Sequence, residues 1–180
     1  LCLKRLRVFG KAAYTVDFAK MKKEFGSILP FSHNHGAWDL EAGRIHLLCD
    51  NQAQAFTGNY FMRDASVSAP VQPENGESIC LALRAQGAQR GYYAGLHGRG
   101  KVAILAMENG RAEVLAEGAL DWRYGESRMI RFTAVGRQLT LEAGDVTLQA
   151  EDSRFAYGMT GFGMLSMGRA YLGNLNVCEM

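Results

Sequence analysis

Apolar and polar residues alternate with a period of two through most of the chain after Phe61. Between Phe61 and Val71 the odd-numbered positions from Ala65 onward are apolar, and the even-numbered positions Asp64, Ser66 and Ser68 are polar. Such alternation is typical of a half-buried β-strand, because successive side chains point to opposite faces. The same pattern predicts further strands over Ser78–Ala85, Val102–Ala106, Val114–Ala116, Met129–Val135, Leu139–Leu141, Val146–Leu148 and Ala170–Val177.

Glycine-containing turns separate these segments. Asn109-Gly110 is the residue pair favoured in two-residue hairpins, and Ala143-Gly144-Asp145 also accepts the positive φ of a tight turn. Turns spaced about 8–12 residues apart are typical of antiparallel sandwiches. We therefore predict an all-β fold, a two-sheet antiparallel jelly-roll sandwich of the concanavalin A-like kind, formed by residues 1–180 as a single domain.

The N-terminal third has a less regular pattern. Leu3–Phe9, Tyr14–Phe18 and Arg44–Cys49 are predicted strands. Lys20–Phe25 fits either one helical turn or a charged loop, and Ser27–Asp39 is predicted to be an irregular loop.

Charge and length limit the classes of partner. The 180 residues carry a net charge of +2, but the first 23 contain seven basic residues and only one acidic residue, Asp17. No aromatic residues interleave with these bases in the way that nucleic-acid grooves need, so we interpret them as a solvated edge and expect no nucleic-acid partner. The start of the chain lacks the apolar core of a signal peptide, and no apolar run approaches the ~18 residues of a membrane span. We expect no membrane association, a cytoplasmic location and, since the chain begins with Leu1, a place within a longer protein.

Four cysteines and three histidines were considered as metal ligands. Cys2, Cys49, Cys80 and Cys178 show no zinc-type spacing and are expected to be buried, reduced thiols, with a Cys2–Cys178 bridge between terminal strands as the alternative. His33, His35 and His46 lie near Asp39 and Glu41, which could hold a metal, but the sequence His33-Asn34-His35-Gly36 also reads as a plain polar loop. We favour the loop, and predict no metal and no cofactor.

No arrangement of residues points clearly to catalysis. Sandwich glycosidases need two carboxylates on one face of a strand, and Glu113 and Glu117 are the candidate pair here. Their apolar neighbours Val114 and Ala116 already supply the inward face, so we interpret both carboxylates as solvated. No Gly-x-Ser-x-Gly elbow supports a serine triad. We predict no catalytic residue.

The stretch from Arg84 to Leu96 is the most distinctive in the chain. It gathers arginines, glutamines and tyrosines among small residues, and a rigid guanidinium fork beside a flat tyrosine ring suits a sugar. Tyr92 and Tyr93 point to opposite faces of a strand, so at most one of them faces a ligand. The predicted ligand-binding residues are Arg84, Arg90, Tyr92, Tyr93 and His97; a purely structural strand and turn is the alternative. Trp38 and Trp122 are expected to lie in the core, with a role as stacking platforms left open.

Several of these segments together resemble a known superfamily. They include Gly91-Tyr92-Tyr93-Ala94-Gly95-Leu96, Gly136-Arg137-Gln138-Leu139-Thr140-Leu141 and the closing Leu172-Gly173-Asn174-Leu175-Asn176-Val177. The pattern resembles the concanavalin A-like lectin/glucanase superfamily, with 3-keto-disaccharide hydrolase-like and laminin-G-like domains as the nearest branches. It is also similar to the C-terminal sandwich of some bacterial ADP-ribosylglycohydrolase-like proteins.

The resemblance implies a non-catalytic accessory domain. Such a domain would bind a glycan or an ADP-ribose-like ligand and serve an upstream catalytic domain, a hydrolase, in the same chain. The acidic magnesium clusters of the ADP-ribosylglycohydrolase catalytic domain and the carboxylates of sandwich glucanases have no counterparts at matching positions. Two alternatives remain open: a glycoside hydrolase-like domain with its own activity, and a structural domain that docks on its neighbour.

Overall fold

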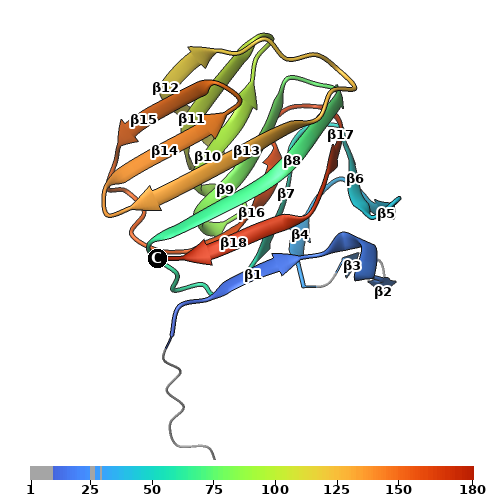
Figure 1. The fold of residues 1–180 in the computed structure, drawn as a ribbon, viewed down its shortest axis with the longest axis horizontal. Helices are drawn as coiled ribbons and strands as arrows, with labels where there is room; N and C mark the ends of the chain where they lie inside the picture. The colour runs from blue at the N-terminus through green and yellow to red at the C-terminus, as the bar shows by residue number, and fades with distance from the viewer. Residues whose placement is uncertain (1–9, 25–26, 29) are drawn as a thin grey trace, which may run out of the picture.

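Two stacked antiparallel sheets make up the body of the protein. The computed structural model describes residues 10–24, 27–28 and 30–180, and its ribbon is shown in Figure 1. The first sheet has nine strands. Seven of them lie in the order β15 (Val146–Glu151), β14 (Gln138–Ala143), β13 (Arg128–Val135), β8 (Ala65–Asn75), β17 (Gly168–Leu172), β6 (Arg44–Cys49) and β5 (Ala37–Glu41). β18 (Leu175–Glu179) also pairs with β8, and β1 (Ala13–Val16) pairs with β18.

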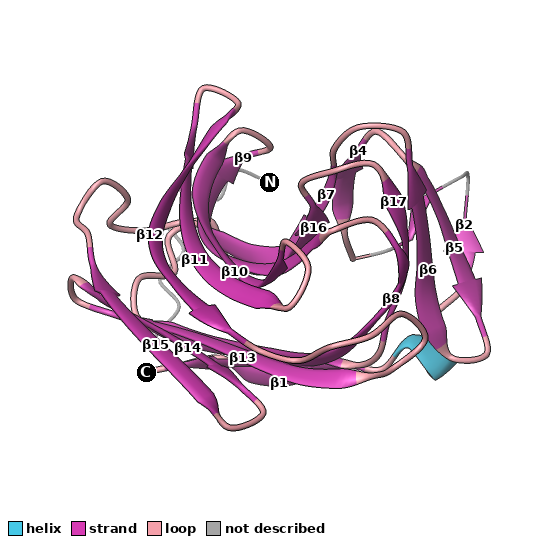
Figure 2. Ribbon diagram, turned by 90° about the horizontal axis from the view of Figure 1, so that it is seen from above, coloured by secondary structure: helices cyan, strands magenta, loops and turns pink. Residues whose placement is uncertain are grey.

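The second sheet has seven strands and is strongly curled. Their order is β12 (Arg111–Ala119), β11 (Lys101–Glu108), β10 (Arg90–His97), β9 (Ser78–Gly87), β16 (Met159–Met164), β7 (Ala53–Thr57) and β4 (Ser32–Asn34). Seen from above, the ribbon of this sheet is concave on the side that faces away from the first sheet (Figure 2). A small hairpin of β2 (Lys23–Glu24) and β3 (Ser27–Ile28) and the 3-10 turn η1 (Phe18–Lys20) complete the described elements. The all-β, two-sheet antiparallel prediction is confirmed.

The main core lies between the sheets and follows the predicted alternation. On β8, Val67, Ala69 and Val71 are fully buried, and they face a core that includes Leu81 and Leu83 of β9. Burying a side chain of this size stabilises the fold by roughly 1.5–3 kcal/mol. The hairpin predicted around Gly144 is the β14–β15 turn, and Trp38 and Trp122 are both buried in this core.

A smaller apolar cluster covers the other face of the curled sheet. Cys80 and Ala82 of β9, Tyr93 of β10 and Leu105 of β11 alternate with the main-core residues and are fully buried. Burial on both faces explains why the sequences of β9 to β11 are nearly continuous runs of apolar residues. Gly161 of β16 fits against the backbone of β7, where a Cβ would collide with the carbonyl of Ala55. The sheet can therefore curl tightly at this strand.

Several local predictions were wrong. Ser27–Asp39, predicted as an irregular loop, contains β3, β4 and the start of β5. In the segment predicted as one helical turn or a charged loop, the described residues 20–24 form neither throughout: η1 ends at Lys20, and β2 follows at Lys23–Glu24. The predicted last strand, Ala170–Val177, is two strands, because β17 and β18 pair with successive parts of β8 and Gly173 donates to the Pro70 carbonyl between them. Among the described residues, no helix is long and apolar enough to cross a membrane.

The cysteines differ from one another. Cys49 and Cys80 are buried thiols, as predicted, whereas Cys178 is exposed. The strand predicted over Leu3–Phe9 and the residue Cys2 lie outside the described residues, so the alternative Cys2–Cys178 bridge stays a prediction.

Candidate ligand-binding site

Arg84, the first of the predicted binding residues, lies inside the protein. Only 3% of its surface is exposed, and its guanidinium pairs with the Asp64 carboxylate at 3.1 Å. Its Nε donates to the carbonyl of Arg63 at 2.8 Å, and its Nη1 donates to the carbonyls of Gly136 and Phe155. All of these partners belong to loops, so Arg84 fastens loops together.

Tyr92 and Tyr93 are also buried, on opposite faces of β10 as the alternation predicts. Tyr92 packs in the main core, where its hydroxyl donates to Asp152 at 2.6 Å and accepts from the Phe155 amide at 3.1 Å. Burial, together with the bond to Asp152, raises the pKa of Tyr92 to about 12. Tyr93 lies in the smaller cluster, with its hydroxyl 3.4 Å from the Ala88 carbonyl. A sugar can reach neither ring in this conformation.

Arg90 and His97 are closer to solvent. The Arg90 side chain is 44% exposed and pairs with Glu108 at 3.3 Å. His97 is half-buried, and its Nδ1 lies 2.9 Å from the hydroxyl of Ser78. Burial lowers the pKa of His97, which keeps the imidazole neutral at pH 7. Ser78 is only 3% exposed, so this serine–histidine pair is closed to a substrate and does not act as a nucleophile and base.

The candidate carboxylate pair is separated by a bulge. Glu113 lies opposite Ala106 and Glu117 opposite Ala103, and these alanines belong to opposite faces of β11. The two carboxylates therefore leave β12 on different sides. Each has its own cation: Arg154 lies 2.6 Å from Glu113, and Lys101 lies 2.7 Å from Glu117. This geometry does not suit glycoside hydrolysis, in which both carboxylates flank one bond.

The three histidines do not converge. His33 packs beside Trp38 with ring centroids 5.7 Å apart, and His46 stacks on Tyr171 at 4.5 Å, on the outer face of the other sheet. Within residues 10–24, 27–28 and 30–180, no three histidine, cysteine or acidic side chains are placed to hold a metal ion.

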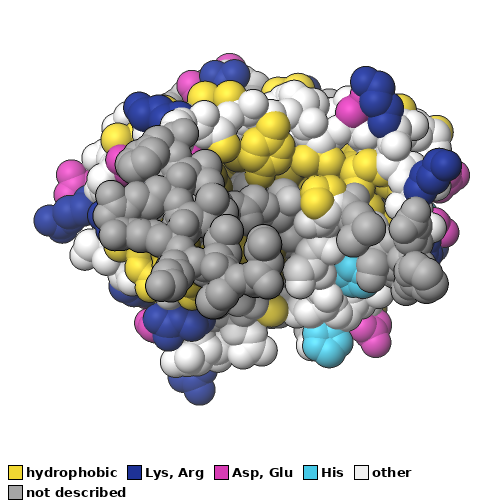
Figure 3. All heavy atoms as spheres, turned by 90° about the horizontal axis from the view of Figure 1, so that it is seen from below, with side chains coloured by type: hydrophobic (Ala, Val, Ile, Leu, Met, Phe, Trp, Pro, Cys, Tyr) yellow, Lys and Arg dark blue, Asp and Glu magenta, His cyan; other side chains and the backbone are white. Residues whose placement is uncertain are grey.

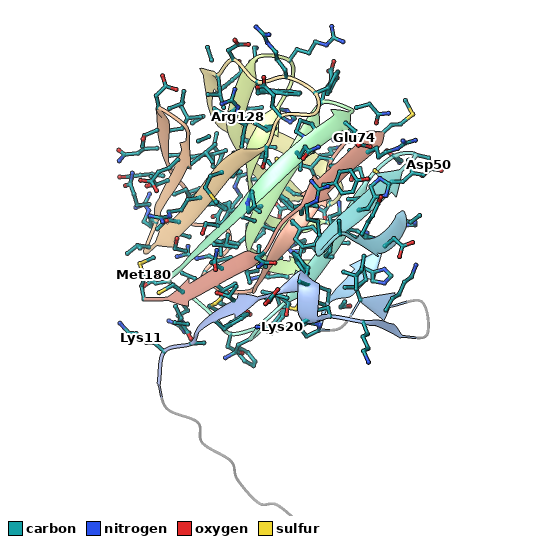
Figure 4. The ribbon with its side chains drawn as sticks, turned by 45° about the vertical axis from the view of Figure 1, so that its right-hand side comes forward. Lys11, Lys20, Asp50, Glu74, Arg128 and Met180 are labelled. Carbon is teal, nitrogen blue, oxygen red and sulfur yellow. The ribbon has the colours of Figure 1, made fainter. Side chains whose placement is uncertain are left out.

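A cavity of about 310 Å³ brings together amide side chains from three separate turns. We call it the amide pocket; it is lined by Asn34, His35, Asp50, Asn51, Gln52, Gln54 and Gln89. Asn34 and His35 come from the end of β4, residues 50–54 from the β6–β7 turn and β7, and Gln89 from the β9–β10 turn. Asp50 lies at the surface, at the right-hand edge of the molecule in Figure 4.

Gln54 is the unusual residue of the amide pocket. It is 1% exposed, yet neither its side-chain Oε1 nor its Nε2 has a hydrogen-bond partner among the described residues. Leaving a buried amide unpaired costs about 1–3 kcal/mol, so such groups are rare unless something outside the protein chain pairs with them. The backbone around it is well held, because the Gln54 amide donates to Asn34 Oδ1 at 2.7 Å.

The neighbouring turn is also fixed. His35 has a positive φ of 39°, which is uncommon for a residue with a side chain, and its carbonyl accepts a 2.6 Å hydrogen bond from the indole of Trp38. Strained turns of this kind gather at binding sites, where the surrounding structure holds them in place. The pocket thus presents a set of amide donors and acceptors with one carboxylate, and the described part of the chain contributes no lysine or arginine to its lining.

Sequence reasoning identified only part of this site. Gln89 lies within the stretch singled out as distinctive, and Asn34 and His35 lie in the polar loop considered for metal binding. The run Asp50-Asn51-Gln52-Ala53-Gln54 matches no binding motif, although Gln54 is a polar residue in an otherwise buried strand. That mismatch was the available signal, since a buried polar side chain is more informative than an exposed one.

Comparison with known proteins finds structures of similar fold but no matching family. No protein-family model matches the chain, and no curated protein matches it. Among solved structures, the carbohydrate-binding module CBM66 from Bacillus subtilis is similar with a TM-score of 0.76 and 19% identity, covering 83% of this chain and 95% of that one. The Ca²⁺-bound exoplasmic/lumenal domain of VIP36 has a TM-score of 0.69 and 11% identity, covering 92% and 90%.

A third similar structure is a domain of an enzyme. Domain 4 of AbnA, a GH43 extracellular arabinanase from Geobacillus stearothermophilus in complex with arabinotriose, has a TM-score of 0.54 and 10% identity, covering 83% of this chain and 82% of that one. At these identities the similarity concerns the backbone. The chain has the concanavalin A-like sandwich fold that these proteins share.

Proposed function

We propose that this domain is a non-catalytic glycan-binding module that holds sugar hydroxyls in the amide pocket. The observation that carries the proposal is the convergence of Asn34, Asn51, Gln52 and Gln89 on one cavity. Its lining also includes Gln54, whose buried amide has no partner among the described residues. A sugar hydroxyl both donates and accepts, so it can pair with either end of a carboxamide. The other amides of the pocket extend the same chemistry around the cavity.

The charge of the pocket favours a neutral sugar over an ADP-ribose-like ligand. Proteins bind phosphates with arginine, lysine or helix N-termini, and none of these is among the described residues that line the amide pocket. The Asp50 carboxylate would instead repel a diphosphate. The ADP-ribose alternative therefore has no support in this pocket.

The similar structures support binding without defining the sugar. VIP36 has been solved with Man3GlcNAc bound, and the arabinanase domain with arabinotriose. The second of these is one domain of a hydrolase, and we propose a similar accessory role here, beside a catalytic domain of the same protein. A hydrolase activity of the domain itself is not favoured, because Glu113 and Glu117 leave β12 on opposite sides.

A glycan array followed by calorimetry tests the proposal. We expect a neutral glycan to bind, and we expect Gln89→Ala and Asn51→Ala each to weaken binding about fivefold to tenfold, as the loss of one hydrogen bond would. Gln149→Ala is the matched control, because Gln149 is an exposed glutamine on β15, outside the pocket. Binding that is equally strong in all three variants, or no binding to any neutral glycan, would overturn the proposal.

A further inference from the structure

Three aromatic side chains gather on loops near the start of β8. Tyr60 and Phe61 are 40% and 70% exposed, and the half-buried Tyr157 lies beside them, with centroid distances of 5.5, 5.7 and 6.0 Å among the three rings. We call this cluster the aromatic platform. The turn that bears Tyr60 and Phe61 leads into β8 at the end of the molecule where the C-terminus lies (Figure 1). Viewed from below, the described side chains include an apolar group above the centre of this end and charged ones around its rim (Figure 3).

The first half of the platform is held rigidly. In the turn Asn59–Met62 the Met62 amide donates to the Asn59 carbonyl at 3.2 Å, and the Phe61 amide donates to Asn59 Oδ1 at 2.9 Å. The Met62 side chain is buried in the main core. The turn is thus anchored on its inner side while Phe61 points into solvent, so the exposed ring does not arise from a loose loop.

The second half is tied to the first. The amide of Gly158, next to Tyr157, donates to the Met62 carbonyl at 2.9 Å, and the Gln86 side chain donates to the Tyr157 carbonyl at 3.1 Å. Arg84 joins both loops, because it donates to the carbonyls of Arg63 and Phe155. Rings that are already fixed lose little conformational entropy when a ligand packs on them. Arg84 is therefore a positioning residue for the platform.

We propose that the aromatic platform stacks on sugar rings of the same glycan that enters the amide pocket. This inference rests on the proposed function and adds an extended chain as the ligand class. Aromatic faces pack on the C–H faces of sugar rings, and the tyrosine hydroxyls can bond to sugar hydroxyls. The β9–β10 turn links the surfaces, since the Gln86 side chain donates to the backbone carbonyl of Tyr157 and Gln89, three residues on, lines the pocket. Three residues span at most about 11 Å of chain.

The size of the platform favours a sugar over a protein partner. Three aromatic side chains of about 150–250 Å² each, partly exposed, offer well under the roughly 800 Å² per side of a stable protein interface. That area suits one or two sugar rings. If the platform binds a protein instead of a sugar, the glycan affinity in the test below will not depend on glycan length.

Calorimetry with a series of chain lengths tests the inference. Using the sugar found on the array, we expect the wild-type affinity to rise from monosaccharide to longer oligosaccharides. Phe61→Ala should lower the affinity for the long oligosaccharides about tenfold and leave the affinity for the monosaccharide unchanged. Tyr124→Ala is the control, because Tyr124 is also 40% exposed but packs beside Trp122 away from the platform.

The outcomes separate this inference from the proposed function. If a glycan binds and Gln89→Ala weakens it at every length, but Phe61→Ala and Tyr60→Ala leave the gain with length intact, the platform is not a sugar site and the pocket remains one. An equal loss in Tyr124→Ala would also overturn the assignment. If no glycan binds at all, the proposed function fails first. Both platform variants remove exposed side chains, so unchanged thermal unfolding will show that they fold.

Discussion

Replacing Gln54 by methionine separates stability from binding. Methionine has nearly the same length and is unbranched, so it can follow the path of the glutamine beside Gly163 without a new branch point. The backbone bond from residue 54 to Asn34 stays in place. The substitution therefore removes only the carboxamide, whose two polar atoms have no partner among the described residues.

The expected change in stability has an unusual sign. A buried amide without a partner costs about 1–3 kcal/mol, and a water molecule in the pocket would recover part of that. We expect Gln54→Met to leave the free energy of unfolding unchanged or to raise it by about 1 kcal/mol. Most buried substitutions lower it by about 1 kcal/mol. Glycan affinity should fall at least tenfold, because the lining of the pocket loses a donor and an acceptor.

Urea denaturation followed by tryptophan fluorescence measures the first quantity, and calorimetry measures the second. Gln86→Met is the matched comparison, because the Gln86 amide donates to the Tyr157 carbonyl and its loss should lower stability by about 1 kcal/mol. The two variants remove the same chemical group with opposite expected signs. If Gln54→Met loses as much stability as Gln86→Met, the Gln54 amide is a structural group and our reading of the pocket is wrong.

Three further predictions concern the framework around the site. Arg84→Met should lower the free energy of unfolding by about 3 kcal/mol in urea denaturation, because three loop carbonyls lose their donor and Asp64 loses its cation. Arg90→Met removes an exposed ion pair and should lower the same free energy by less than about 1 kcal/mol. Partial burial opposes ionisation of Asp152, but hydrogen bonds from Arg154 and Tyr92 outweigh it and lower the pKa of Asp152 from 3.8 to about 2. The ionised carboxylate therefore stabilises the fold above about pH 4 by at most about 2 kcal/mol, and this stabilisation is lost as the pH falls from about 4 to 2. Asp152→Asn should flatten that part of the stability–pH curve. An unchanged slope would contradict the assignment. Gly161→Ala should lower the melting temperature by several degrees or prevent folding, because its Cβ meets the Ala55 carbonyl, and a wild-type melting curve would show that the sheet can open there.

Sequence reasoning succeeded where side-chain period alone decides the structure. The strands from Ala65 onward were predicted because one buried face imposes alternation on them. It failed for β4 and β5, which are short and lie at sheet edges. Their pairing with β7 and β6 gives them strand geometry that their own residues do not signal.

The predicted site residues show the same limit. Arginine and tyrosine were chosen for what they can do in solvent, but Arg84 and Tyr92 are buried and bonded to loops. Residue type could not reveal this, because an arginine is exposed in most proteins. The ligand-binding roles of Arg90 and His97 stay predictions, and neither residue lines the amide pocket.

The sequence by itself determined the fold class and the inner face of most strands, since a two-residue period can bury only one side of a sheet. The tertiary structure alone decided which polar groups meet. Asn34, Asp50, Gln54 and Gln89 are up to 55 positions apart in the sequence and come together because the second sheet curls and brings the β9–β10 turn to the start of β7. Curvature arises from the packing of many strands at once, so no local pattern encodes it.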